Sequence, residues 1–196
     1  MGQDFRLAAE NLRAARSTLR WDRPTAFAAL GRLFRSGRLP EHTPEGEYSG
    51  ELFAFQVFPG LDWLADRLNA TWRPWRGKRF NPDQNAGENL FSRSSLFATR
   101  LVWPFYQSYE IEGPEIYNAF PFHTWIGPGK ADPDREVLKI DYDLPENPKW
   151  IVRQVLDELV QLDPGLYLGK AYFRWPTGQW QTIAYFSLFK NSGGSL

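Results

Sequence analysis

The chain contains no cysteine and only two histidines among its 196 residues. The absence of cysteine excludes a disulfide framework, a thiolate nucleophile and any metal site with cysteine ligands. Two histidines are also too few for a typical histidine-based metal centre. We therefore expect neither a metal nor another cofactor.

A long apolar run is missing as well. The first residues, Met1 to Leu7, do not form the apolar stretch of a signal peptide, and no run approaches the roughly 18 apolar residues of a membrane span. These features predict a soluble, cytoplasmic protein without a membrane span.

The chain has no net charge, which argues against a dedicated nucleic-acid-binding protein. Charge is nevertheless uneven, because residues 1–38 carry eight arginines and three acidic residues, a net charge of +5. This segment either binds an acidic partner or presents a solvated helix face against a more acidic body. The oligomeric state stays open, and a homodimer is compatible with the sequence.

Aromatic residues are abundant: 15 Phe, 9 Trp and 8 Tyr make up 16% of the chain. So many large rings must be buried or line a cavity. The length suits one domain, since typical domains have roughly 100–200 residues. We expect one aromatic-rich, mainly β domain of the α+β class.

Helical periodicity marks the N-terminal region. Apolar residues recur every three or four positions after Asp4, which predicts a helix to about Arg20. Pro24 suits the first turn of a second helix, and Gly37 suits its end. A third, long helix is predicted from Pro148 to Leu162, before the C-terminal hairpin.

These patterns divide the chain into a helical extension (1–38) packed on the same domain, a β-barrel domain (39–190) and a tail (191–196). Aromatic and β-branched residues between turn signals predict most of the strands. The strands are predicted at 47–58, 96–110, 114–122, 136–143, 166–175 and 179–190, with a short helix at 61–68.

Three segments resemble a group of bacterial lipocalin-like proteins that share a Gly-x-Trp-x-Gly motif. Gly46-Glu47-Tyr48-Ser49-Gly50 has Tyr48 in place of the tryptophan. Trp75 to Phe80 with Asn89-Leu90-Phe91, and the hairpin over 166–189, are similar to later parts of that pattern. The resemblance implies an antiparallel, calycin-like barrel around a small apolar cavity and implies no established activity.

The segment from Trp72 to Phe80 interleaves four cations with three aromatic residues. Such a segment can stack on nucleic-acid bases, form the mouth of a cavity that attracts an anionic or carbonyl-bearing ligand, or serve only as a structural stack. His123, which lies between large rings, is either a hydrogen-bonded structural residue or a donor to a ligand.

Three functional hypotheses follow. The first is non-enzymatic binding of a small hydrophobic or amphipathic molecule in a barrel cavity. The second is a cavity enzyme of the isomerase, cyclase or hydratase type, which requires His123, Asp141 or Arg79 to converge inside the barrel. The third is a protein-interaction scaffold that uses the basic N-terminal helices. No catalytic residue is assigned, and the candidate ligand-binding residues are Trp72, Trp75, Arg76, Arg79, Trp103, Tyr106, Tyr109, Phe122, His123, Trp125, Asp141 and Tyr142.

Overall fold

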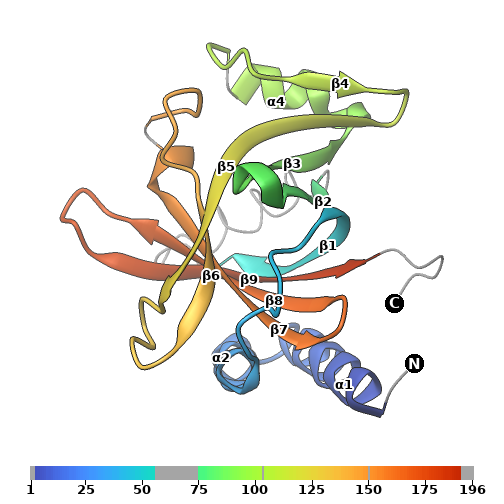
Figure 1. Ribbon diagram of the computed structural model, residues 1–196, viewed down its shortest axis with the longest axis vertical. Coiled ribbons are helices and arrows are strands. Elements are labelled where there is room, and N and C mark those ends of the chain that lie inside the picture. The colour runs from blue at the N-terminus through green and yellow to red at the C-terminus, as the bar shows by residue number, and fades with distance from the viewer. Residues whose placement is uncertain (1–2, 56–74, 103, 150, 191–196) are drawn as a thin grey trace.

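The fold, seen in a computed structural model, is an antiparallel β-barrel with two helices along its outside (Figure 1). The structure describes residues 3–55, 75–102, 104–149 and 151–190. The helices are α1 (Gln3–Thr18), α2 (Arg23–Ser36) and α4 (Leu96–Val102), with short 3₁₀ turns at Pro82–Gln84, Arg93–Ser95 and Val152–Gln154. The strands are β1 (Gly46–Phe55), β2 (Trp75–Asn81), β3 (Ala86–Ser92), β4 (Glu110–Glu112), β5 (Ile116–Pro128), β6 (Glu136–Asp141), β7 (Val155–Asp163), β8 (Leu166–Arg174) and β9 (Trp180–Lys190).

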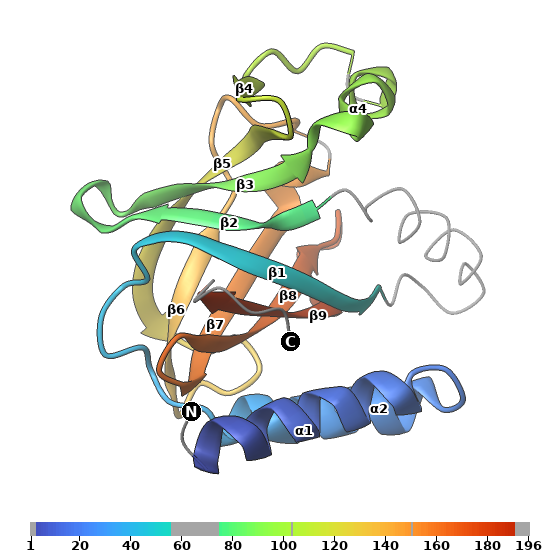
Figure 2. The same ribbon diagram turned by 90° about the vertical axis from the view of Figure 1, so that its right-hand side faces the viewer.

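Eight strands close the barrel. They follow the order β3-β2-β1-β9-β8-β7-β6-β5, and pairing between β3 and β5 completes the ring. The short β4 pairs with β5 and lies with α4 at one end of the barrel, away from α1 and α2 (Figure 2). In this ring β2 and β7 are four strands apart in either direction, so their inward side chains face each other across the interior.

The N-terminal helices cover the outer face of the barrel over β7, β8 and β9. Leu12 of α1 and Leu30 and Phe34 of α2 are buried in one cluster with Leu168 of β8 and Tyr185 of β9. The two N-terminal helices predicted from apolar periodicity are confirmed, because each has one apolar stripe that packs on the sheet. No helix in the described part of the chain is long and apolar enough to cross a membrane.

The predicted long helix at 148–162 is wrong. Most of that segment is β7, preceded by a 3₁₀ turn. Leu159 of β7 faces the barrel interior, whereas Val160 faces the N-terminal helices, so both sides of the strand are buried. A strand buried on both faces lacks polar alternation, and its apolar run therefore resembles that of a buried helix.

The prediction of a strand at 96–110 is also wrong. Residues 96–102 form α4 instead. The short strand β4 begins at residue 110, where the predicted strand ends, and covers residues 110–112. Strands β2 and β3 were not predicted. Five predicted strands are present with shifted ends: β1 (predicted at 47–58), β5 (114–122), β6 (136–143), β8 (166–175) and β9 (179–190). The short helix predicted at 61–68 lies outside the described residues.

Candidate functional site: a buried lysine inside the barrel

Lys78 of β2 carries a charged side chain into the barrel interior, where it is only 2% exposed. Its Nζ donates a hydrogen bond to Asn89 Oδ1 at 3.0 Å and another to the Tyr142 hydroxyl. Nζ also lies 3.1 Å from Asp157 Oδ2, with which it forms an ion pair. Since Asp157 belongs to β7, this ion pair joins opposite walls of the barrel.

Aromatic rings enclose the same ammonium group. Lys78 Nζ lies 5.0–5.6 Å from four ring centroids, on Tyr142, Phe186, Phe122 and Trp75. The electron-rich faces of such rings attract a cation, by about 0.5–2 kcal/mol each depending on desolvation. The four rings come from different parts of the barrel wall, so the cage depends on closure of the ring of strands.

Burial dominates the titration of this group of side chains. Burial lowers the pKa of Lys78, and the negative charge of Asp157 opposes this effect. Burial raises the pKa of Asp157, against the positive charge of Lys78. Burial and the nearby Asp157 raise the pKa of Tyr142 well above its ordinary value. Burial thus shifts the pKa values of Lys78 and Asp157 toward each other.

Hydrogen bonds to both the oxygen and the nitrogen of its side-chain amide hold Asn89 in place. Its Oδ1 accepts from Trp75 Nε1 at 3.1 Å as well as from Lys78. Its Nδ2 donates to the Phe120 carbonyl oxygen at 3.0 Å. Phe120 has a positive φ of 54°, a strained conformation for a residue other than glycine. The pairing of β3 with β5 shifts register at this point, between Gly87 and Asn89, and this irregularity supports the orientation of the polar group that faces Lys78.

Trp75 closes the site on its partly exposed side, since its side chain is half-buried whereas Lys78, Phe122 and Tyr142 are buried. Gly50 makes room for this ring, and Gly77 makes room for the neighbouring β1 backbone. A Cβ atom on Gly50 would overlap the Trp75 ring, and a Cβ atom on Gly77 would overlap the Tyr48 carbonyl oxygen. Gly77 also has a φ of 143°, which side chains rarely permit.

The candidate residues from the sequence lie in several places. Trp75, Phe122 and Tyr142 meet around Lys78. Tyr106 and Tyr109 form a separate pair, with ring centroids 4.6 Å apart. In this pair the Tyr106 hydroxyl accepts from the Phe120 amide at 2.6 Å, and burial raises the pKa of Tyr109 to about 12. Trp72 and Trp103 lie outside the described residues.

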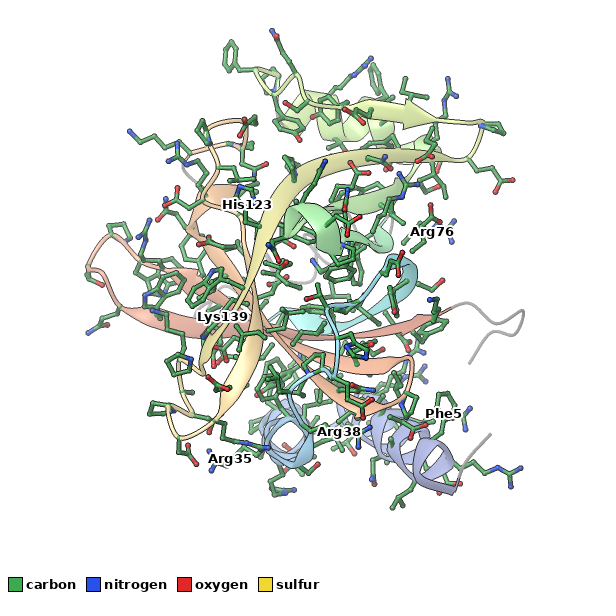
Figure 3. All side chains as sticks on the ribbon, viewed as in Figure 1. Phe5, Arg35, Arg38, Arg76, His123 and Lys139 are labelled. Carbon is green, nitrogen blue, oxygen red and sulfur yellow. The ribbon has the colours of Figure 1, made fainter. Side chains whose placement is uncertain are left out.

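The remaining candidates lie on the outside of the barrel. Arg76 is exposed, and His123 lies on another side of the molecule (Figure 3). Asp141 pairs in register with His123 across β5 and β6, and its neighbours Ile140 and Tyr142 take the inward positions. Trp125 is two residues beyond His123 on the same outer face.

Arg79, also outside, forms ion pairs with three glutamates: Glu47 of β1, Glu88 of β3 and Glu112 of β4. Arg79, His123 and Asp141 therefore do not converge in the interior, and an enzyme that uses these three groups inside the barrel lacks support. Within the described ranges, no three His, Asp or Glu side chains gather in a way that would hold a metal ion.

Sequence reasoning missed Lys78, Asn89, Asp157 and Phe186 as members of one site. Lys78 belongs to the cation-rich segment from Trp72 to Phe80. The alternation of side chains along a strand was the signal that could have found it, because it places Lys78 on the same face as the apolar Phe80 and opposite Arg79. Asp157 could not be found, because its segment was predicted to be helical. Comparison of the chain with protein-family models, with curated proteins and with solved structures finds no match.

Proposed function

We propose that this barrel binds a small amphipathic molecule in its interior and that Lys78 contacts the polar end of that molecule. The observation that carries the proposal is a lysine ammonium inside the barrel, enclosed by four aromatic rings and paired with Asp157. Such a site offers a few polar and charged contacts within a mainly aromatic surface, the usual composition of a small-molecule site.

Stability alone does not account for this cluster. Replacing a buried ion pair with well-packed apolar residues is often neutral or stabilising by about 1–4 kcal/mol. Buried groups whose pKa values are strongly shifted by desolvation and by a specific charged partner occur preferentially at functional sites. Lys78 and Asp157 have both properties.

The chemistry of the cluster defines the ligand class. Lysine only donates hydrogen bonds, so its ligand must offer an acceptor such as a carboxylate or a carbonyl oxygen. Nζ contacts three acceptors, on Asn89, Tyr142 and Asp157, and a ligand oxygen would replace Asn89 Oδ1 or the Tyr142 hydroxyl. The apolar body would contact the rings, with entry on the side of the half-buried Trp75.

We also propose that the chain is a distant relative of the lipocalin-like group with the Gly-x-Trp-x-Gly motif. The positions of the resembling segments support this proposal. Tyr48 is buried in the same core cluster as the site, and Gly50 and Gly77 make room for the Trp75 ring and the β1 backbone. Both short segments therefore contribute to the surroundings of Lys78.

A binding titration tests the proposed function. Intrinsic tryptophan fluorescence would be followed while carboxylic acids of the lipid, terpenoid and polyketide classes are added, each beside its methyl ester. We expect saturable binding of at least one acid, at least tenfold weaker binding of its ester, and at least tenfold weaker binding of the acid by Lys78→Met. The matched control is Arg76→Met, which removes an exposed cation from the same strand and should leave affinity within twofold.

The absence of a saturable response across this set would contradict the proposal. Equal affinity of Lys78→Met and the unchanged protein would also contradict it. Circular dichroism of each variant separates loss of binding from loss of the fold.

A second candidate function is an enzyme in which the Lys78 amine adds to an aldehyde or ketone. The lowered pKa of Lys78 and the neighbouring Asp157 favour this candidate, since a neutral amine is the nucleophile and the carboxylate accepts its proton. The nitrogen would bond to the carbonyl carbon, and the carbonyl oxygen would leave as water. Borohydride reduction in the presence of an apolar aldehyde should then add the mass of the aldehyde, less that of one oxygen atom, to the peptide containing Lys78, and an unmodified peptide would exclude this reaction.

A further inference from the structure

A second candidate site lies outside the barrel wall. It is a groove of about 380 Å³ between the β5–β6 pair, the loop at 128–133, the start of β7 and the β8–β9 hairpin. Its lining includes two tryptophans, Trp125 and Trp180, and several charged side chains. Lys139, on the floor of the groove, lies on the same outer side of the barrel as His123 (Figure 3).

Trp125 provides a flat apolar surface in this groove. The ring lies across the strand at Gly127, where a Cβ atom would overlap it. The backbone at Gly127 thus supports one part of the ring, and yet Trp125 remains 48% exposed. An indole supported in this way can stack against a planar ligand.

The floor of the groove is a buried ion pair. Lys139 and Glu158 face each other across β6 and β7 and are almost fully buried, and Lys139 Nζ donates a hydrogen bond to Glu158 Oε1. The same oxygen accepts from the backbone amide of Lys130 at 2.6 Å. Glu158 therefore fixes both the floor of the groove and the loop that carries Lys130.

Cations outnumber carboxylates by one in and under the groove. Lys130, Lys139, Arg153 and Arg174 line it together with Asp141 and Asp143, and Glu158 beneath the lining offsets the charge of Lys139. Asp143 forms ion pairs with two of these cations, since Arg153 Nε lies 2.7 Å and Arg174 Nη2 lies 3.6 Å from its carboxylate oxygens.

The ammonium group of Lys130 is placed over an aromatic ring. Lys130 Nζ lies 4.4 Å from the centroid of Trp180, and the guanidinium carbon of Arg174 lies 5.7 Å from the same centroid. An anion placed beside Trp180 would therefore meet two cations at once, and hydrogen bonds between ionised groups are stronger than those between neutral ones.

We propose that this groove binds a flat organic anion, such as an aromatic carboxylate, with its ring on Trp125 and its anionic group beside Lys130. The excess of cations favours an anion over a neutral planar molecule, which would gain the stacking contact without an ionic one. This site is separate from the barrel interior and does not depend on Lys78.

Nuclear magnetic resonance of the full chain, labelled with nitrogen-15, tests this proposal. Naphthoate is the probe, and naphthalenemethanol is its neutral analogue. We expect naphthoate to shift the indole N–H signals of Trp125 and Trp180 saturably and to bind at least tenfold more tightly than the neutral analogue. Trp125→Ala and Lys130→Gln should each weaken naphthoate binding at least fivefold.

Two control variants separate this site from other sites. Trp21→Ala removes a tryptophan that is 87% exposed in the turn between α1 and α2, and it should leave naphthoate affinity unchanged. Lys78→Met, measured where circular dichroism shows it to be folded, should also leave it unchanged, so failure of the interior site and failure of the groove are distinguishable. The proposal is overturned if millimolar naphthoate shifts neither indole signal, if the neutral analogue binds equally well, or if Trp125→Ala binds naphthoate as the unchanged protein does.

Discussion

Replacing Lys78 with methionine should destabilise the fold, because it leaves Asp157 buried without its positively charged partner. Methionine has a similar length and fills much of the same volume, so little of the effect would come from a cavity. Removing one member of a buried ion pair costs about 3–5 kcal/mol. We expect the free energy of unfolding at neutral pH to fall by that amount.

The geometry supports this magnitude. Lys78 Nζ and Asp157 Oδ2 are 3.1 Å apart, which corresponds to an attraction of about 5 kcal/mol at an effective dielectric constant of about 20. Loss of the cation also removes its contacts with four aromatic rings. Since whole domains have a stability of only about 5–15 kcal/mol, the variant should lose a large part of it.

Urea unfolding of a double-mutant cycle measures the effect. The cycle comprises Lys78→Met, Asp157→Asn and the double variant, with Arg76→Met as a control for loss of an exposed cation on β2. We expect the double variant to be more stable than the sum of the single changes predicts, by about 2–3 kcal/mol. Arg76→Met should change stability by less than about 0.5 kcal/mol.

The cost of Lys78→Met should also depend on pH. Burial already raises the pKa of Asp157, and loss of the opposing cation should raise it further. A carboxyl group whose pKa is higher in the folded than in the unfolded state favours the fold at low pH, and this contribution is lost as pH rises through the folded pKa. The cost should therefore shrink between pH 7 and about pH 4. A cost below about 1 kcal/mol at pH 7, or strict additivity in the cycle, would refute the reasoning.

Three further changes test other parts of the fold. Gly77→Ala should lower the melting temperature markedly, because the new Cβ would overlap the Tyr48 carbonyl oxygen at a φ of 143°, and an unchanged melting curve would contradict the stated geometry. Burial raises the pKa of Asp132, but a hydrogen bond and the positive charge from Lys170 outweigh burial and hold this pKa below its ordinary value. The ionised Asp132 carboxylate therefore stabilises the fold above about pH 4. In urea titrations the destabilisation by Asp132→Asn should thus be full at pH 7 and shrink as pH falls below that value. Deletion of residues 1–38 should leave a barrel that aggregates or unfolds, because the deletion uncovers the apolar face of β7 to β9. Size-exclusion chromatography and circular dichroism measure this effect, and a folded, monodisperse remainder would show that these helices are dispensable.

The parts of the fold that the sequence predicts well are those in which burial is one-sided or the signal is local. Helices α1 and α2 each press one apolar stripe on the barrel, so their periodicity is visible in the sequence. The β8–β9 hairpin is likewise local, since its turn contains Gly178 with a φ of 83° between two strand-forming runs. Strand β7 is buried on both faces, and its sequence pattern therefore predicted a helix.

The cation-rich aromatic segment was identified from the sequence, but its interpretation needed the tertiary structure. Which of its cations faces inward follows from strand β2, which was not predicted. Among its cations in the described residues 75–80, Lys78 turns into the barrel, whereas Arg76 is exposed and Arg79 pairs with glutamates outside.

By itself the sequence determined the aromatic excess, the N-terminal helices and most of the strands, because these follow from composition and from contacts between near neighbours. Only the tertiary structure decided that Lys78 meets Asp157, since their strands lie on opposite walls of the barrel. That meeting depends on the order in which eight strands close into a ring. Strand order is set by packing between distant segments, which no local pattern records.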